Sequence, residues 1–233
     1  MMHPVVFKDL GLVDYKKTWD YQEALLQQIV EHKKLNHASP IEPTQYLLFC
    51  EHPAVFTLGK SGDKSHLLLA ENLLKEKKID YYHINRGGDI TFHGPGQIVV
   101  YPIIDLDWYF NDIHRYLRTL EEIVIDTIKS FGIEGDRVEG LTGVWIKEVK
   151  IPRKICAMGV RCSRWVTMHG IALNVNTDLS YYDYIVPCGI QDKGITSIAK
   201  ERNQAVDMHK VKAELLKNFE KHFEFNLIEN KSV

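Results

Sequence analysis

The sequence predicts an α+β protein with a mixed, mainly antiparallel sheet flanked by helices. Three observations support this class. Helix-like segments lie near both ends and in the middle of the 233-residue chain, strand-like runs fill the two intervals between them, and strand and helix do not alternate one by one as in a parallel α/β fold. No long linker divides the chain, so we expect residues 1–233 to form a single domain.

Three segments have the apolar periodicity of amphipathic helices, at about residues 15–34, 111–131 and 207–223. Asn111 and Asp207 are of the residue types that cap helix N-termini, and we expect them to begin the second and third helices. The apolar stripes are Tyr15, Trp19, Leu26, Ile29 and Val30, then Leu117, Leu120, Val124 and Ile128, then Val211, Leu215, Phe219 and Phe223. A shorter helix is predicted over residues 67–77.

Short apolar runs bounded by glycine, proline or other turn residues predict the strands. The expected strands cover residues 46–50, 55–58, 82–85, 90–92, 98–104, 143–146, 155–161 and 168–175. A turn at Glu51-His52-Pro53 separates the first two.

Composition narrows the possible functions. Apolar residues make up 45% of the chain and charged residues 26%, as in a globular protein with a sizeable core. The net charge of −2 gives no overall attraction to nucleic acid or to an anionic membrane. The N-terminus lacks the pattern of a secretory signal, and the most apolar run, residues 98–104, is too short to span a bilayer. We therefore expect a cytoplasmic protein with neither nucleic acid nor a membrane among its partners.

The four cysteines form no C-x-x-C pair, which indicates free thiols in a reducing compartment. Cys50, Cys156 and Cys162 fall in strand-like runs, where we expect them to be small buried residues. Cys188 lies at a turn between a proline and a glycine. It is either another buried thiol or a nucleophile, with the backbone N–H groups that follow it available to an oxyanion.

A cysteine nucleophile needs a partner that favours its thiolate, because the ordinary pKa of a thiol is about 8.5. Lys154, His93 and His169 are the candidates. At a strand start a lysine is otherwise a solvated charge, and before a glycine a histidine is otherwise a turn residue. No H-x-x-H or H-E-x-x-H spacing occurs, so we expect no metal site.

Glycine and proline cluster in R-G-G-D-I-T-F-H-G-P-G-Q, residues 86–97. This stretch predicts either a glycine-rich hairpin or a backbone that approaches a ligand closely. It is not a dinucleotide fingerprint, because no third glycine follows at the required spacing, and it is not a P-loop, because the Lys-Ser/Thr pair is missing.

Residues 147–164 contain six basic residues and one acid. The basic residues are Lys147, Lys150, Arg153, Lys154, Arg161 and Arg164. They are either solvated charges on strand faces or a positive surface that docks an acidic partner.

Four ordered motifs together resemble the lipoyl(octanoyl) transferase family, the octanoyl-[acyl-carrier-protein]:protein N-octanoyltransferases. They are R-G-G-D-I-T-F-H-G-P-G-Q-I-V-V-Y-P at 86–102, G-V-W-I at 143–146 with R-K-I-C-A-M-G-V-R at 153–161, H-G-I-A-L-N at 169–174, and P-C-G-I at 187–190. The resemblance runs roughly from residue 51 to residue 198. Asp89 and Phe92 depart from it, since Gln and Tyr are expected there in many members, and residues 147–152 look slightly long.

The resemblance implies a fold similar to the catalytic domain of biotin and lipoate protein ligases. It implies Cys188 as the acyl-carrying nucleophile and Lys154 as its acid/base partner. It places the acyl substrate against three stretches of the chain. These are Arg86, Gly87, Gly88, Asp89, Ile90, Thr91, Phe92 and His93; Ala157, Met158 and Gly159; and Gly170, Ile171 and Ala172.

The implied reaction moves an octanoyl or lipoyl group from acyl carrier protein, where phosphopantetheine carries it, to a lysine of lipoyl domains. The implied acceptors are the E2 subunits of 2-oxoacid dehydrogenases and the glycine cleavage H protein, and no cofactor is expected. The alternatives are an ATP-dependent lipoate–protein ligase on the same fold, a non-catalytic binder of lipoyl domains or acyl carrier protein, and a cysteine hydrolase.

Overall fold

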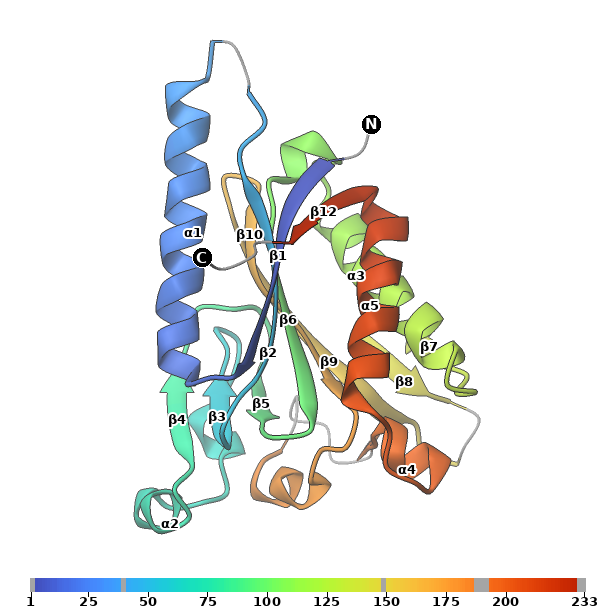
Figure 1. The fold of residues 1–233 in the computed structure, drawn as a ribbon. Helices are drawn as coiled ribbons and strands as arrows, with labels where there is room; N and C mark the ends of the chain where they lie inside the picture. Colours follow the sequence, from blue (N-terminus) through green and yellow to red (C-terminus); the bar gives the residue numbers. More distant parts are fainter. Residues whose placement is uncertain (1–2, 39–40, 148–149, 187–192, 230–233) are drawn as a thin grey trace.

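A large twisted β-sheet forms the centre of the computed structural model, with helices on both of its faces (Figure 1). The structure describes residues 3–38, 41–147, 150–186 and 193–229. A second, three-stranded sheet lies at one side of the large sheet. No helix in these ranges is both long and apolar enough to cross a membrane.

The large sheet is mixed and mainly antiparallel, which confirms the predicted fold class. Its order is β12 (Phe225–Glu229), β1 (His3–Leu12), β2 (Gln45–Glu51), β6 (Gln97–Ile103), β10 (Val166–Asn174), β9 (Arg153–Ser163), β8 (Leu141–Ile146) and β7 (Asp136–Val138). The short β11 (Gly194–Ile195) pairs with β9 in parallel. β1 pairs in parallel with both β12 and β2, and the remaining pairs along this path are antiparallel.

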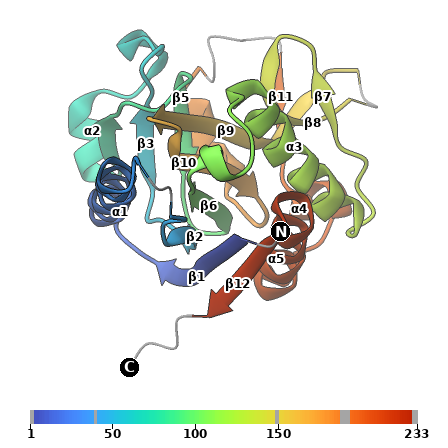
Figure 2. The same cartoon turned by 90° about the horizontal axis from the view of Figure 1, so that it is seen from above.

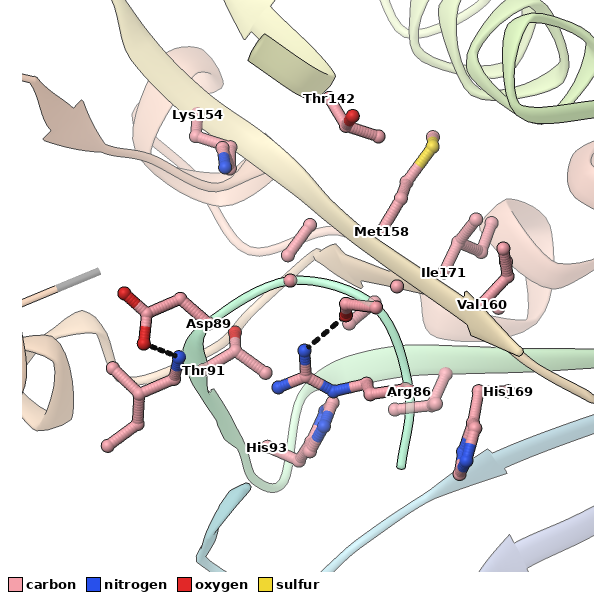
Figure 3. Close-up of a pocket in the computed structure, with 18 of the residues that line it drawn as sticks. Arg86, Asp89, Thr91, His93, Thr142, Lys154, Met158, Val160, His169 and Ile171 are labelled. Carbon is pink, nitrogen blue, oxygen red and sulfur yellow. Dashed lines mark hydrogen bonds between the residues drawn. The ribbon is translucent and has the colours of Figure 1, made fainter. Parts of the chain in front are cut away.

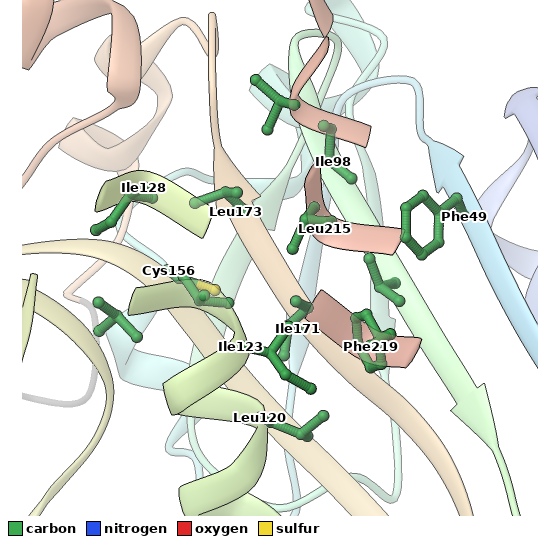
Figure 4. Close-up of a cluster of buried hydrophobic side chains, with 14 of the residues drawn as sticks. Phe49, Ile98, Leu120, Ile123, Ile128, Cys156, Ile171, Leu173, Leu215 and Phe219 are labelled. Atoms are coloured by element: carbon green, nitrogen blue, oxygen red, sulfur yellow. The ribbon is translucent and has the colours of Figure 1, made fainter. Parts of the chain in front are cut away.

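Alternate residues of the central strands face opposite sides of the sheet and build two cores. Helices α3 (Ile113–Lys129) and α5 (Met208–Phe223) cover one face, where Phe49 and Ile171 lie among their side chains (Figure 4). Helix α1 (Tyr15–Leu35) covers the other face, against Leu48 and Ala172 (Figure 2). Strands buried on both faces explain why the sequence shows continuous apolar runs there.

The smaller sheet places β3 (Val55–Leu58) between β4 (Asp80–His83) and β5 (Ile90–His93). Helix α2 (Glu71–Glu76) lies at one end of it, and short 3-10 helices occur at Lys64–His66, Leu106–Trp108 and Leu179–Tyr184. Helix α4 (Ile198–Arg202) precedes α5. β5 leads through the glycine-rich stretch into β6, so the two sheets share the motif that the sequence analysis singled out.

Most helix predictions are confirmed, with two corrections. Asp207 caps α5, but Asp112 and not Asn111 caps α3, since its Oδ1 accepts the N–H groups of His114 and Arg115 at 2.9 and 3.0 Å. Only residues 71–76 of the predicted helix 67–77 are α-helical. The sequence analysis also placed the β4 strand two residues late and missed β1, β7, β11 and β12.

Candidate active site

A cavity of about 370 Å³ lies where residues 86–93 cross β9 and β10 (Figure 3). That volume is typical of a small-molecule site. Thirteen of the fourteen residues that the family resemblance assigned to the acyl substrate line it. The exception is Phe92, which is buried on the other side of β5 and stacks on Tyr181 with ring centroids 4.5 Å apart. Successive strand residues point to opposite faces, so Phe92 faces away while Thr91 and His93 face the cavity.

Glycines let two backbones meet at this wall. The N–H of Gly87 donates to the carbonyl of Val160 at 2.9 Å, so the turn at residues 86–88 is bonded to β9. A Cβ on Gly159 would lie 2.7 Å from the Gly87 carbonyl oxygen, closer than van der Waals contact allows. The glycine-rich stretch is therefore required, at least in part, by a close approach to β9.

One part of the lining is apolar. It comes from β6, α3, β8, β9, β10 and β11 and consists of Val99, Leu117, Leu141, Ala157, Met158, Val160, Ile171, Ala172 and Ile195. Leu117 was predicted as a core residue, but it is only partly buried and faces the cavity; Tyr116 and Ile123 take the core positions of α3. An alkyl chain placed against this surface would exchange water for apolar contact.

Arg86 fixes the turn to the smaller sheet. Its Nη2 donates to the carbonyl and to the hydroxyl of Thr57 at 2.7 and 3.0 Å, and its Nη1 donates to the carbonyl of Gly87 at 2.9 Å. Only 7% of Arg86 is exposed, so its guanidinium is a buried cation beside the cavity. Thr57 is a positioning residue that no sequence motif revealed.

Lys154, on β9, also lines the cavity and is 8% exposed. Its Nζ lies 4.7 Å from the centroid of the Trp145 ring, and its carbonyl accepts the N–H of Thr196 at 2.9 Å. Cys188, the predicted nucleophile, lies outside the described residues. The structure therefore places Lys154 in the cavity wall, and the catalytic roles of both residues stay predictions.

The two candidate histidines are buried and neutral. Burial, the largest cause, together with nearby Arg86 lowers the pKa of both His93 and His169 to about 3. A neutral imidazole does not supply the positive charge that favours a thiolate. His93 Nδ1 is hydrogen bonded to Gln97 Oε1 at 2.8 Å, whereas neither ring nitrogen of His169 has a hydrogen-bond partner in the described part of the chain. Among the three predicted partners, Lys154 therefore remains the candidate for that charge.

A family model described as the lipoyl protein ligase A/B catalytic domain matches residues 14–220. The chain belongs to the lipoyl protein ligase A/B catalytic-domain family. A curated relative from Cytophaga hutchinsonii, named octanoyltransferase, is 54% identical over 229 residues, which cover 96% of this chain and 94% of that protein. This relationship confirms the predicted family and the prediction of an acyltransferase.

Two solved structures show the same fold at low sequence identity. Lipoate-protein ligase A bound with ATP has a TM-score of 0.72 at 14% identity and covers 100% of this chain and 90% of that chain. A bipartite lipoate protein ligase from Thermoplasma acidophilum, described together with its E2 lipoyl domain, has a TM-score of 0.67 at 17% identity, covering 100% and 88%. The predicted fold of the lipoate ligases is thereby confirmed.

Within this family member, Asp89 is the only carboxylate among the described cavity-lining residues. Its Oδ2 lies 2.6 Å from Nδ1 of His66, and its Oδ1 accepts the N–H of Ile90 at 2.7 Å. The sequence analysis gave His66 no role, because no local motif marks it and 23 positions separate it from Asp89. Asp89 contributes a carboxylate to a cavity that Arg86 and Lys154 also line.

The predicted basic cluster does not form one free positive surface. Lys147 pairs with Asp136 at 2.8 Å, Arg153 pairs with Glu201 through two of its nitrogens, and Arg161 pairs with Glu23. Arg161 also lies seven residues along β9 from Lys154, beyond the reach of a common rim. Acids that are distant in the sequence therefore neutralise several of these cations.

The remaining thiols are weak nucleophile candidates. Cys50 and Cys156 are buried as expected, and burial raises the pKa of both thiols well above the ordinary value. Cys162 is exposed, which corrects the prediction that it is buried. It lies near the far end of β9, next to the turn into β10, where edge positions meet solvent.

Proposed function

We propose that the chain transfers an octanoyl group from acyl carrier protein to a specific lysine of lipoyl domains, through a thioester on Cys188. The observation that carries the proposal is the 54% identity, over nearly the whole of both chains, to a protein named octanoyltransferase. The cavity supports it, because an acyl chain needs an apolar wall and a thiolate needs a nearby cation such as Lys154.

The reaction divides into two transfers at one carbonyl carbon. The Cys188 thiolate attacks the donor thioester, the new C–S bond forms, and the phosphopantetheine sulfur leaves with a proton from the Lys154 ammonium. A neutral acceptor amine then attacks the Cys188 thioester, the C–N bond forms, and the nitrogen gives its extra proton to Lys154. Cys188 leaves as the thiolate that the restored ammonium favours, so the cycle closes.

The energetics need no cofactor. The first step exchanges one thioester for another, and the second converts a thioester into a more stable amide, which drives the sequence forward without ATP. Octanoate has seven carbons beyond its carbonyl, and burying them contributes on the order of 5 kcal/mol at ~0.8 kcal/mol per methylene. Binding energy of this size favours medium acyl chains over short ones.

The cavity is long enough for this chain. Three bonds of an extended chain span about 3.8 Å, so the seven bonds of octanoate span roughly 9 Å. The seven residues from Lys154 to Val160 extend for about 20 Å along β9. An octanoyl group with its carbonyl beside Lys154 therefore ends near Met158, before it reaches His169, and Figure 3 shows these side chains in that order.

The acceptors we propose are the lipoyl domains of 2-oxoacid dehydrogenase E2 subunits and the glycine cleavage H protein. A family member that modifies a lysine must admit a narrow side chain from another protein. A lipoate ligase of the same fold is described with its E2 lipoyl domain, which supports this class of acceptor. The donor we propose is octanoyl-acyl carrier protein.

Intact-mass measurement after exposure to octanoyl-acyl carrier protein tests the proposal. We expect one octanoyl adduct that hydroxylamine removes. Cys188→Ser should abolish it, and Cys162→Ser, which alters an exposed thiol on β9, should keep it. An adduct that persists in Cys188→Ser would exclude Cys188 as the carrier. Exchange of pyrophosphate into ATP would instead identify a ligase.

Substitution of Lys154 tests its role separately. Lys154→Arg keeps a positive charge but cannot release a proton near neutral pH, so we expect transfer to fail while the fold is retained. Near-normal turnover of Lys154→Arg, with circular dichroism like that of the parent, would mean that Lys154 supplies charge alone.

A further inference from the structure

The carboxylate of Asp89 is fixed at the cavity wall by partners that leave it little freedom. His66 Nδ1 lies 2.6 Å from its Oδ2, and the N–H of Ile90 lies 2.7 Å from its Oδ1. The side chain of Asp89 is 12% exposed and that of His66 is 26% exposed, so the pair is partly open to solvent. Gly62 packs close to Asp89, since a Cβ there would lie 2.5 Å from Oδ1.

Asp89 lies toward the same end of the cavity as Lys154. Figure 3 shows Asp89 and Lys154 toward one end of the cavity and His169 toward the other. The backbone of His66 is bonded to a second segment, because its carbonyl accepts the N–H of Val186 at 2.8 Å. Cys188 follows Val186 by two positions in the sequence. Asp89 and Lys154 therefore line the same end of the cavity.

The reaction of the acceptor lysine requires a group that binds its ammonium ion. A lysine side chain, with an ordinary pKa near 10.4, arrives as an ammonium ion and cannot attack a thioester until it loses a proton. Arg86 repels that charge, whereas the carboxylate of Asp89 attracts it.

We propose that the Asp89 carboxylate binds the ε-ammonium of the acceptor lysine; this inference rests on the proposed function. The ammonium donates to the Asp89 carboxylate, its first proton passes through that carboxylate to solvent, and the neutral amine attacks the acyl thioester. The second proton goes from the nitrogen of the tetrahedral intermediate to Lys154, so charge and protons balance.

The identity of residue 89 also leads to a prediction specific to this chain. The family resemblance leads us to expect glutamine at position 89 in many members. Glutamine can still accept a hydrogen bond from an ammonium or from His66, but it carries no charge. A hydrogen bond to a charged acceptor is stronger than one to a neutral acceptor by an amount that corresponds to about a tenfold change in an equilibrium or rate ratio.

Single-turnover experiments on the acyl-enzyme test the inference. The enzyme is loaded with octanoyl-pantetheine, and decay of the thioester is followed with a lipoyl domain, a charged acceptor, and with hydroxylamine, a neutral one. For Asp89→Gln we expect kcat/KM for the lipoyl domain to fall about tenfold. Loading and the hydroxylamine reaction should stay within about twofold of the parent. Asp63→Asn changes a neighbouring exposed carboxylate that does not line the cavity, and it should change neither rate.

Two other results would overturn the inference. An equal loss with both nucleophiles would show that Asp89 shapes the cavity and does not bind the ammonium. An unchanged rate with the lipoyl domain would show that the ammonium is bound elsewhere. A parent enzyme that never forms the thioester would overturn the proposed function itself, and the inference with it, so the two failures are distinguishable.

Discussion

Replacing Glu121 with glutamine should destabilise the protein strongly, although the substitution changes only one atom of the side chain. Glu121 lies on α3 and is fully buried. Its Oε2 forms an ion pair with Arg118 Nη1 at 2.7 Å and accepts from Arg137 Nε at 2.9 Å, and its Oε1 accepts the N–H of Gly143 at 3.0 Å. The carboxylate thus ties α3 to β7 and to β8, the strand that also carries Leu141 of the cavity wall.

The contacts set the expected magnitude. The amide of glutamine can keep one acceptor but loses the charge that both arginines face, and hydrogen bonds to a buried charge contribute roughly 1.5–3 kcal/mol each. The arginine side chains are 47% and 32% exposed, so solvent recovers part of that loss. We expect the free energy of unfolding to fall by about 3 kcal/mol, at the low end for breaking a buried ion pair. That corresponds to a melting temperature lower by roughly 6–12 °C for a chain of this size.

Urea denaturation followed by tryptophan fluorescence measures the effect. The matched control is Glu122→Gln, which removes a single contact to Arg137 Nη2 from a side chain that is 42% exposed, and it should lose less than about 1 kcal/mol. If Glu121→Gln lost no more than this control, the buried charge would not be what holds α3 to β8, and the reasoning would fail.

Three further predictions concern the cavity and its supports. Gly170→Ala places a Cβ against a backbone carbonyl of β6, so β10 must shift, and we expect a loss of about 2–3 kcal/mol in urea unfolding; a loss below about 0.5 kcal/mol would contradict this close approach. Met158→Trp fills the region where the octanoyl chain ends, so the ratio of hexanoyl to octanoyl transfer should rise, and an unchanged ratio would place the chain elsewhere. Burial lowers the pKa of His52 to about 4, and that of His93 and His169 to about 3, so below about pH 6.5 the unfolded chain binds protons that the folded chain does not. The free energy of unfolding therefore has its full value above that pH. As the pH falls toward 4, it decreases by up to about 1.4 kcal/mol per pH unit for each histidine. Urea midpoints that do not decline between pH 7.5 and 4.5 would refute this prediction.

Local sequence determined the elements whose signal is periodic. The stripe of α5, from Val211 to Phe223, is fully buried as predicted, because residues three and four apart share one face of a helix whatever lies opposite. The strands β2, β3 and β6 were placed within one residue for a similar reason, since apolar runs between turn residues persist in both sheets. The α3 cap was missed by one position because Asn111 and Asp112 are equally good capping residues, and only the path of the chain into the helix selects one.

The family resemblance of the sequence also identified half of the cavity lining, because thirteen of the proposed substrate contacts lie in three short motifs that converge on β9 and β10. Tertiary structure decided the rest. It turned Phe92 away from the cavity, paired Arg161 with Glu23 and brought His66 to Asp89. These outcomes depend on which residues meet after strands distant in the sequence have paired, and a linear pattern carries no record of those distances. The tertiary structure therefore decides which charged side chains meet in the cavity, although the sequence already shows which residues are charged.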